Sequence, residues 1–80
     1  MIETSERPLL TFALYAHNEE RYVRDAIQSA FEQTYHPLQI ILSDDGSSDG
    51  TFEIMQKMAR AYHGPHVITL NRNTTNLGVV

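Results

Sequence analysis

Three short apolar runs alternate along the chain with two longer amphipathic segments. The apolar runs span residues 9–15, 38–43 and 66–70. Runs of this length are typical of strands buried on both faces, as in a parallel sheet. Between them, apolar residues recur at helical spacing: Val23, Ala26, Ile27, Ala30 and Phe31, and then Met55, Met58, Ala59 and Tyr62. The pattern predicts an α/β fold of order β-α-β-α-β, with a parallel, Rossmann-like sheet and right-handed crossovers.

The predicted elements suggest one domain that is not self-contained. Residues 1–7 are polar and aperiodic, so we interpret them as an N-terminal extension, and residues 8–80 as the folded part. Three parallel strands and two helices would leave sheet faces and edges uncovered. We therefore expect residues 8–80 to be a truncated part of a larger domain, whose exposed sheet edges would also permit a homodimer.

Composition narrows the class of partner. Six basic and ten acidic residues give a net charge of −4, without a basic cluster. This argues against nucleic acid or an anionic membrane as the main partner. The longest apolar-biased run is about eight residues, against the roughly 20 that span a bilayer, so this chain has no predicted transmembrane segment. We expect a cytoplasmic protein, and membrane association through other parts of it stays open.

Two adjacent carboxylates, Asp44 and Asp45, follow the second apolar run and precede a glycine-punctuated turn. In open α/β sheets, ligands bind outside the carboxyl ends of the strands. Carboxylates only accept hydrogen bonds, which suits the N3–H of a uracil ring or the hydroxyls of a ribose. The alternative is that Asp and Gly serve here only as good turn residues.

The exit of the first strand is the second candidate region. Tyr15, Ala16, His17, Asn18 and Glu19 would lie beside Asp44 and Asp45 if the two strands are neighbours, with their backbone facing the same ligand. The alternative is that Asn18 only caps the first helix and His17 is a solvated loop residue. Neither a G-x-G-x-x-G nor a Walker A motif occurs, so dinucleotide or P-loop binding has no support.

Together these segments resemble the N-terminal nucleotide-binding part of family 2 glycosyltransferases of the GT-A fold. Residues 15–23 (YAHNEERYV) are close to the family's Y-N-E-x-x-Y-L pattern, and 29–35 (SAFEQTY) match its S-x-x-x-Q-T-Y helix end. Residues 44–51 (DDGSSDGT) match its D-D-G-S-x-D-G-T signature, and 76–78 (NLG) match its N-x-G. The resemblance covers residues 8–80 in the family's order.

The resemblance implies transfer of a sugar from a nucleotide-diphosphate donor, commonly UDP-linked, to an acceptor hydroxyl, with inversion. It assigns the base contact to Asp45, a supporting role to Asp44, and the lining of the base and ribose pocket to the backbone of residues 15–17. His17 replaces the usual tyrosine, and Tyr15 stands where proline or threonine is common, so the shape of the base pocket stays open. The sugar, acceptor and pathway are not identified, although polysaccharide biosynthesis is one expected setting.

The resemblance also places the chemistry outside this chain. A divalent metal, Mn²⁺ or Mg²⁺, would be held by an Asp-x-Asp motif further downstream, as would the general base. We therefore assign no catalytic or metal-binding residue here and expect these 80 residues alone to be inactive. The rival hypothesis is a non-catalytic α/β module that is regulatory or binds Mg²⁺ through its acidic pair.

Overall fold

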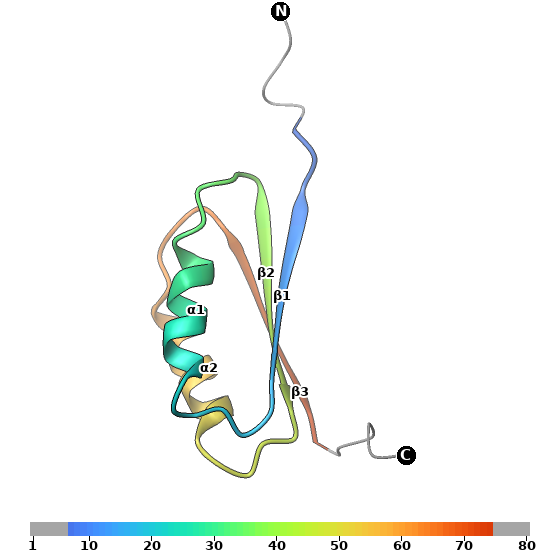
Figure 1. The fold of residues 1–80 in the computed structure, drawn as a ribbon. Coiled ribbons are helices and arrows are strands. Elements are labelled where there is room, and N and C mark those ends of the chain that lie inside the picture. Colours follow the sequence, from blue (N-terminus) through green and yellow to red (C-terminus); the bar gives the residue numbers. More distant parts are fainter. Residues whose placement is uncertain (1–6, 75–80) are drawn as a thin grey trace, which may run out of the picture.

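The computed structural model describes residues 7–74, and it confirms the α/β order (Figure 1). Three parallel strands form one sheet in the order β1-β2-β3. The elements are β1 (Leu10–Ala16), α1 (Val23–Phe31), β2 (Leu38–Asp45), α2 (Thr51–Ala61) and β3 (Val67–Asn73). The predicted Rossmann-like arrangement of a GT-A N-terminal part is therefore present.

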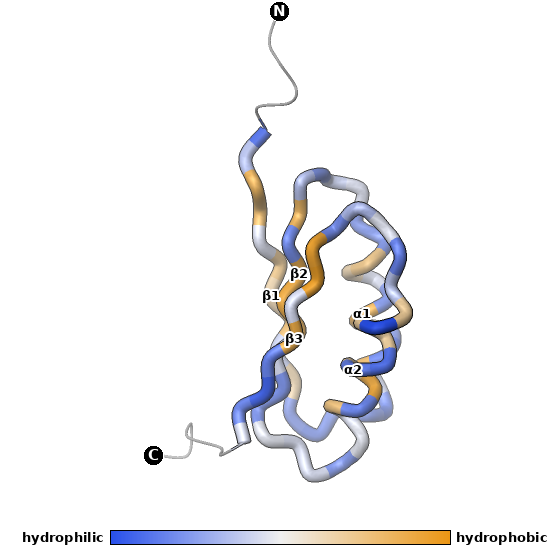
Figure 2. Tube along the Cα trace, turned by 180° about the vertical axis from the view of Figure 1, so that it is seen from behind, coloured by the Kyte–Doolittle hydropathy of each residue, from blue (hydrophilic) through white to orange (hydrophobic). Residues whose placement is uncertain are grey.

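Both helices cover the same face of the sheet, as Figure 1 shows. This follows from the strand order, because two successive right-handed crossovers in one direction place both helices on one side. Because the strands are parallel, the carboxyl ends of all three lie at the same edge of the sheet. Figure 2 shows hydrophobic stretches along the middle of the strands and hydrophilic chain where β3 ends at this edge.

The core lies between the sheet and the helices. On β2, Ile40 and Leu42 point toward the helices and are fully buried. They belong to one cluster with Ile27 of α1 and Met55 of α2. The amphipathic patterns thus predicted the buried helix faces, although Ala26 is exposed. None of the helices within residues 7–74 is long and apolar enough to cross a membrane.

The opposite face of the sheet is more polar. The alternation of side chains along a strand places Gln39, Ile41 and Ser43 of β2 on this face. A hydrogen-bonded row crosses it, in which Gln39 accepts from the hydroxyl of Thr11 and donates to that of Thr69, both at 3.3 Å. This face therefore differs chemically from the apolar, helix-covered one.

Two boundaries differ from the sequence-based prediction. Asp44 and Asp45 are the last residues of β2 rather than residues that follow the strand, because β2 pairs on both sides and its ladders run on to Ala16, Arg72 and Asn73. For the same reason β3 continues to Asn73, beyond the apolar run that ends at residue 70.

The first helix also begins later than predicted. Tyr22 occupies the N-cap position of α1, without a side-chain capping bond. The interpretation of Asn18 as the cap of this helix is therefore wrong. Residues 1–6 of the predicted extension and the 76–78 motif lie outside the described residues.

Candidate nucleotide site at the carboxyl edge of the sheet

Two loops form the edge where the strands end: the β1 loop, residues 17–22, and the β2 loop, residues 46–50. Parallel pairing of β1 with β2 brings them together, as the sequence predicted. The β2 loop begins at Gly46, whose φ of 66° lies in the left-handed region that glycine adopts without strain. The chain then turns back, so that the β2 loop lies against the β1 loop.

Asn18 joins the two loops. Its backbone N–H donates to the Ser47 hydroxyl at 2.8 Å. Its side-chain Oδ1 accepts from the backbone amides of Ser48, at 2.8 Å, and of Asp49, at 3.3 Å. Asn18 therefore satisfies amide groups just before α2, a helix that starts some 30 residues later in the chain, and not those of α1.

Further contacts extend this junction in both directions. The Glu19 amide donates to the Thr51 hydroxyl at 2.8 Å, and the Glu20 amide to the Asp49 carboxylate at 3.3 Å. In return the Glu20 carboxylate accepts from the Gly50 amide at 2.6 Å. A β-carbon on Gly50 would lie 3.0 Å from that same carboxylate oxygen, so glycine suits this close approach.

Asp49 stabilises the start of α2. Its Oδ1 accepts from both the hydroxyl and the amide of Thr51. The Thr51 hydroxyl, opposed by some desolvation and assisted by the amides of Thr51 and Glu20, lowers the pKa of Asp49 below its ordinary value of 3.8. The helix N-cap itself is Gly50, without a side-chain bond, so the capping function falls to the preceding aspartate.

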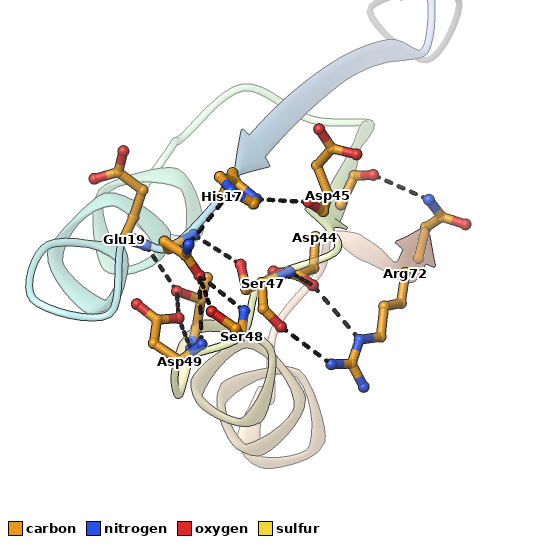
Figure 3. Close-up of polar contacts among 12 residues, drawn as sticks. His17, Glu19, Asp44, Asp45, Ser47, Ser48, Asp49 and Arg72 are labelled. Carbon is orange, nitrogen blue, oxygen red and sulfur yellow. Dashed lines mark hydrogen bonds and ion pairs between the residues drawn. The ribbon is translucent and has the colours of Figure 1, made fainter. Parts of the chain in front are cut away.

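Asp44 is a structural carboxylate. It points toward the helices and is fully buried. Its Oδ2 accepts from the Ser47 amide at 3.0 Å and lies 3.5 Å from Nε of Arg72, which reaches it from the end of β3. Arg72 also donates to the Ser47 carbonyl at 3.4 Å, and its guanidinium stands 4.5 Å from the centre of the Phe52 ring. Asp44 thus anchors the β2 loop from beneath (Figure 3).

Asp45 has a different environment, although it is the next residue. It points to the other face and is half-buried. Within residues 7–74 its carboxylate makes no hydrogen bond or ion pair, and Figure 3 shows it directed away from the polar contacts. Its backbone carbonyl, by contrast, accepts from Nδ1 of His17 at 2.7 Å. The main chain is therefore held while the carboxylate stays available.

The tautomer of His17 follows from these partners. A carbonyl oxygen only accepts, so Nδ1 carries the proton. In the neutral ring Nε2 is then an acceptor, and the Asn18 side-chain amide lies 3.3 Å from it. His17 is consequently part of the junction between the loops rather than a free surface residue.

The remaining predicted residues lie at the same edge. Tyr15 is 75% exposed on the open face of the sheet, and the side chain of Ala16 is buried. The Glu19 carboxylate is directed away from the contacts in Figure 3. All seven predicted site residues are therefore brought together, and their contact with a nucleotide stays a prediction.

Sequence reasoning missed four polar residues of the site: Ser47, Ser48, Thr51 and Arg72. The first three belong to the DDGSSDGT signature, which could have drawn attention to their amides and hydroxyls. No local sequence signal identified Arg72, because its position opposite Asp44 depends on the register of β2 against β3.

The site does not suit a phosphate or a metal ion by itself. The amide groups of residues 47–51, which could bind an anion before a helix, all donate to protein oxygens. Within residues 7–74 no three His, Asp or Glu side chains come close enough together to hold a metal ion. The divalent metal that the family resemblance implies therefore has no fitting set of ligands among these residues.

Comparison with known proteins identifies the family. The sequence model described as "Glycosyl transferase family 2" matches residues 11–79. The match begins within β1 and includes both strand–loop–helix units, with the acidic signature in the second of them. The chain belongs to glycosyltransferase family 2.

Named relatives agree. The chain is 30% identical over 71 residues to "Putative teichuronic acid biosynthesis glycosyltransferase TuaG" of Bacillus subtilis, covering 89% of this chain and 28% of the relative. It is 33% identical over 73 residues to an "Uncharacterized glycosyltransferase" of Haemophilus influenzae, covering 91% and 22%. It is 36% identical over 50 residues to the "Chondroitin synthase" of Escherichia coli, covering 62% and 7%. The chain thus spans under a third of the length of these relatives.

Proposed function

We propose that this chain forms the donor-nucleotide half of a glycosyltransferase that moves a sugar from a UDP-sugar to an acceptor hydroxyl with inversion. The observation that carries the proposal is the pair of environments at the end of β2. Asp44 is used to hold the loop, whereas the Asp45 carboxylate, which has no partner within residues 7–74, offers an acceptor at the edge of the sheet. Family membership supports the reaction class.

The chemistry of the edge favours the nucleoside end of the donor. Four carboxylates besides Asp45 lie around it, those of Glu19, Glu20, Asp44 and Asp49, and Arg72 is already paired with Asp44. A diphosphate would be repelled here, whereas the N3–H of a uracil ring or a ribose hydroxyl would find acceptors. We propose that the phosphates are held elsewhere in the protein, by a divalent cation on a downstream Asp-x-Asp motif.

The names of the relatives suggest a class of acceptor for the transferred sugar. The names of two relatives refer to teichuronic acid and to chondroitin. Both compounds are polymers of sugars. We propose polysaccharide biosynthesis as the setting and a sugar hydroxyl as the acceptor. A cytoplasmic location would give access to nucleotide-sugars.

An NMR titration of the chain with UDP, with and without Mn²⁺, tests the proposal. We expect amide shifts confined to residues 15–18 and 44–47, with little dependence on Mn²⁺ because no metal ligand set lies among residues 7–74. GDP and ADP serve as matched controls, and they should shift these amides less. If the folded chain shows no shifts at millimolar UDP, the titration is repeated on a longer protein of the family that contains this segment. No shifts in that protein either would contradict the assignment.

A further inference from the structure

We propose that Asn18 is a positioning residue of this site, which places Asp45 by fixing His17 between the two loops. The inference rests on the proposed function and goes beyond it, because it assigns Asn18 a role without contact to the nucleotide. The role depends on where the carboxamide is used. Its Oδ1 is engaged by two amides of the β2 loop and its Nδ2 faces His17.

The backbone of Asn18 is the first argument. Its φ is 54°, in the left-handed region that non-glycine residues seldom adopt, and asparagine tolerates this better than most. A strained conformation persists only when the surroundings determine it. Here the bonds of Asn18 to Ser47, Ser48 and Asp49 do so.

The orientation of the carboxamide is the second argument. Two backbone N–H donors face Oδ1, so the oxygen cannot be exchanged for the amide nitrogen without losing both bonds. The nitrogen is consequently directed to Nε2 of His17, which leaves Nδ1 to donate to the Asp45 carbonyl. A continuous chain of contacts thus runs from the start of α2 through Asn18 and His17 to Asp45.

Three substitutions separate the side chain from the backbone. Asn18→Ala removes the carboxamide, and Asn18→Gly removes it while accommodating the left-handed φ. Asn18→Asp keeps an acceptor for both amides, and its second oxygen can accept from Nε2 of His17 when that nitrogen also carries a proton, so that Nδ1 still donates to the Asp45 carbonyl. We expect Ala and Gly to weaken uridine binding about tenfold, the equivalent of about 1.4 kcal/mol. Asp should restore binding to within about threefold, or about 0.7 kcal/mol. Uridine is the probe because it is uncharged and does not respond to the added carboxylate.

Stability is measured in parallel by urea unfolding. The matched control is Tyr35→Phe, which removes a hydrogen bond from Tyr35 to the Pro8 carbonyl at the opposite end of the sheet. It should lower stability and leave the uridine dissociation constant unchanged. If Asn18→Ala does not fold, Asn18→Gly carries the test, since glycine is unstrained at this φ.

The outcomes are distinct. Loss of binding in Ala and Gly with rescue by Asp supports the positioning role. Wild-type binding by Asn18→Gly overturns it, and so does an Asp variant as weak as Ala, because that variant still offers acceptors to the two amides and to His17. If the wild-type chain itself binds neither uridine nor UDP, the proposed function fails and this inference fails with it.

Discussion

The two faces of the sheet meet at the end of β2 in two adjacent aspartates with opposite environments. On the helix-covered face Asp44 is fully buried and bound to the Ser47 amide and Arg72. On the open face Asp45 is half-buried and its carboxylate is unpaired within residues 7–74. The period of two along a strand is sufficient to give identical neighbours different tasks. The helix-covered face holds the β2 loop in place through Asp44, and the open face carries the Asp45 carboxylate proposed to bind the ligand.

The difference has an energetic side. A buried carboxylate is tolerated only when hydrogen bonds and an opposite charge compensate for its desolvation. Asp44 obtains both through Oδ2, although its Oδ1 is buried without a partner within residues 7–74. The Asp45 carboxylate is only half-buried and makes no hydrogen bond or ion pair within residues 7–74, so we expect it to contribute little to folding. Substitutions at the two positions should separate stability from binding.

The largest expected effect is on stability, at Asp44. Asp44→Ala removes the acceptor of the Ser47 amide and leaves Arg72 without its partner. We expect the free energy of unfolding to fall by about 2–3 kcal/mol, less than for a fully buried pair because Arg72 is 43% exposed. Urea unfolding followed by circular dichroism measures it. A loss below about 0.5 kcal/mol would mean that Asp44 does not anchor the loop.

At Asp45 the effect should fall on binding instead. Asp45→Ala removes the acceptor that has no partner within residues 7–74, and we expect the dissociation constant for UDP to rise at least about tenfold. Unfolding free energy should stay within about 0.5 kcal/mol of the wild type. Glu53→Ala, an exposed carboxylate in the first turn of α2, is the control for net charge and should bind UDP as the wild type does. Equal weakening by both variants would attribute the effect to general charge.

A substitution of Arg72, the partner of Asp44 in the ion pair, tests how far this pair stabilises the fold. Arg72→Lys keeps the charge but cannot contact Asp44, the Ser47 carbonyl and the Phe52 ring together, because the ammonium group is compact. We expect a loss of about 1 kcal/mol in unfolding free energy. Arg24→Lys, on the exposed side of α1, should be neutral. Equal stability of the two variants would refute the specific role of the guanidinium.

The smallest effect concerns Asp49 and pH. Its folded-state pKa is lowered mainly by the Thr51 hydroxyl, so its contribution to stability is complete above the ordinary value of 3.8 and is lost as pH falls through the lowered folded-state value. Thr51→Val should raise the pKa of Asp49 toward 3.8. Carboxyl ¹³C NMR titration of both proteins measures the shift, and an unchanged pKa would exclude the hydroxyl as its main cause.

Much of the fold was readable from the sequence. The length of the apolar runs and the helical spacing of residues such as Ile27 and Met55 predicted the order of the elements and the buried helix faces. The proximity of Asp44 and Asp45 to the exit of the first strand, expected if the two strands are neighbours, is confirmed because these strands pair in parallel and end together. These inferences depend on local patterns, which a single sequence contains.

What the sequence did not reveal depends on pairing between distant segments. Asn18 looked like a cap for the nearest helix, yet its partners lie 30 and 31 residues away. The strand membership of Asp44 and Asp45, and the role of Arg72, follow from the register of β2 against β3. Neither residue composition nor periodicity encodes that register directly, so these features could be recognised only in the structure.

The most direct test of the division between the two aspartates is a UDP titration of chain labelled with ¹³C at the aspartate carboxyl carbons. Each carboxylate then reports on its own surroundings. We expect the Asp45 signal to move with UDP concentration and the Asp44 signal, which belongs to a carboxylate buried beneath the loop, to stay in place. Movement of the Asp44 signal with a stationary Asp45 signal would contradict this division.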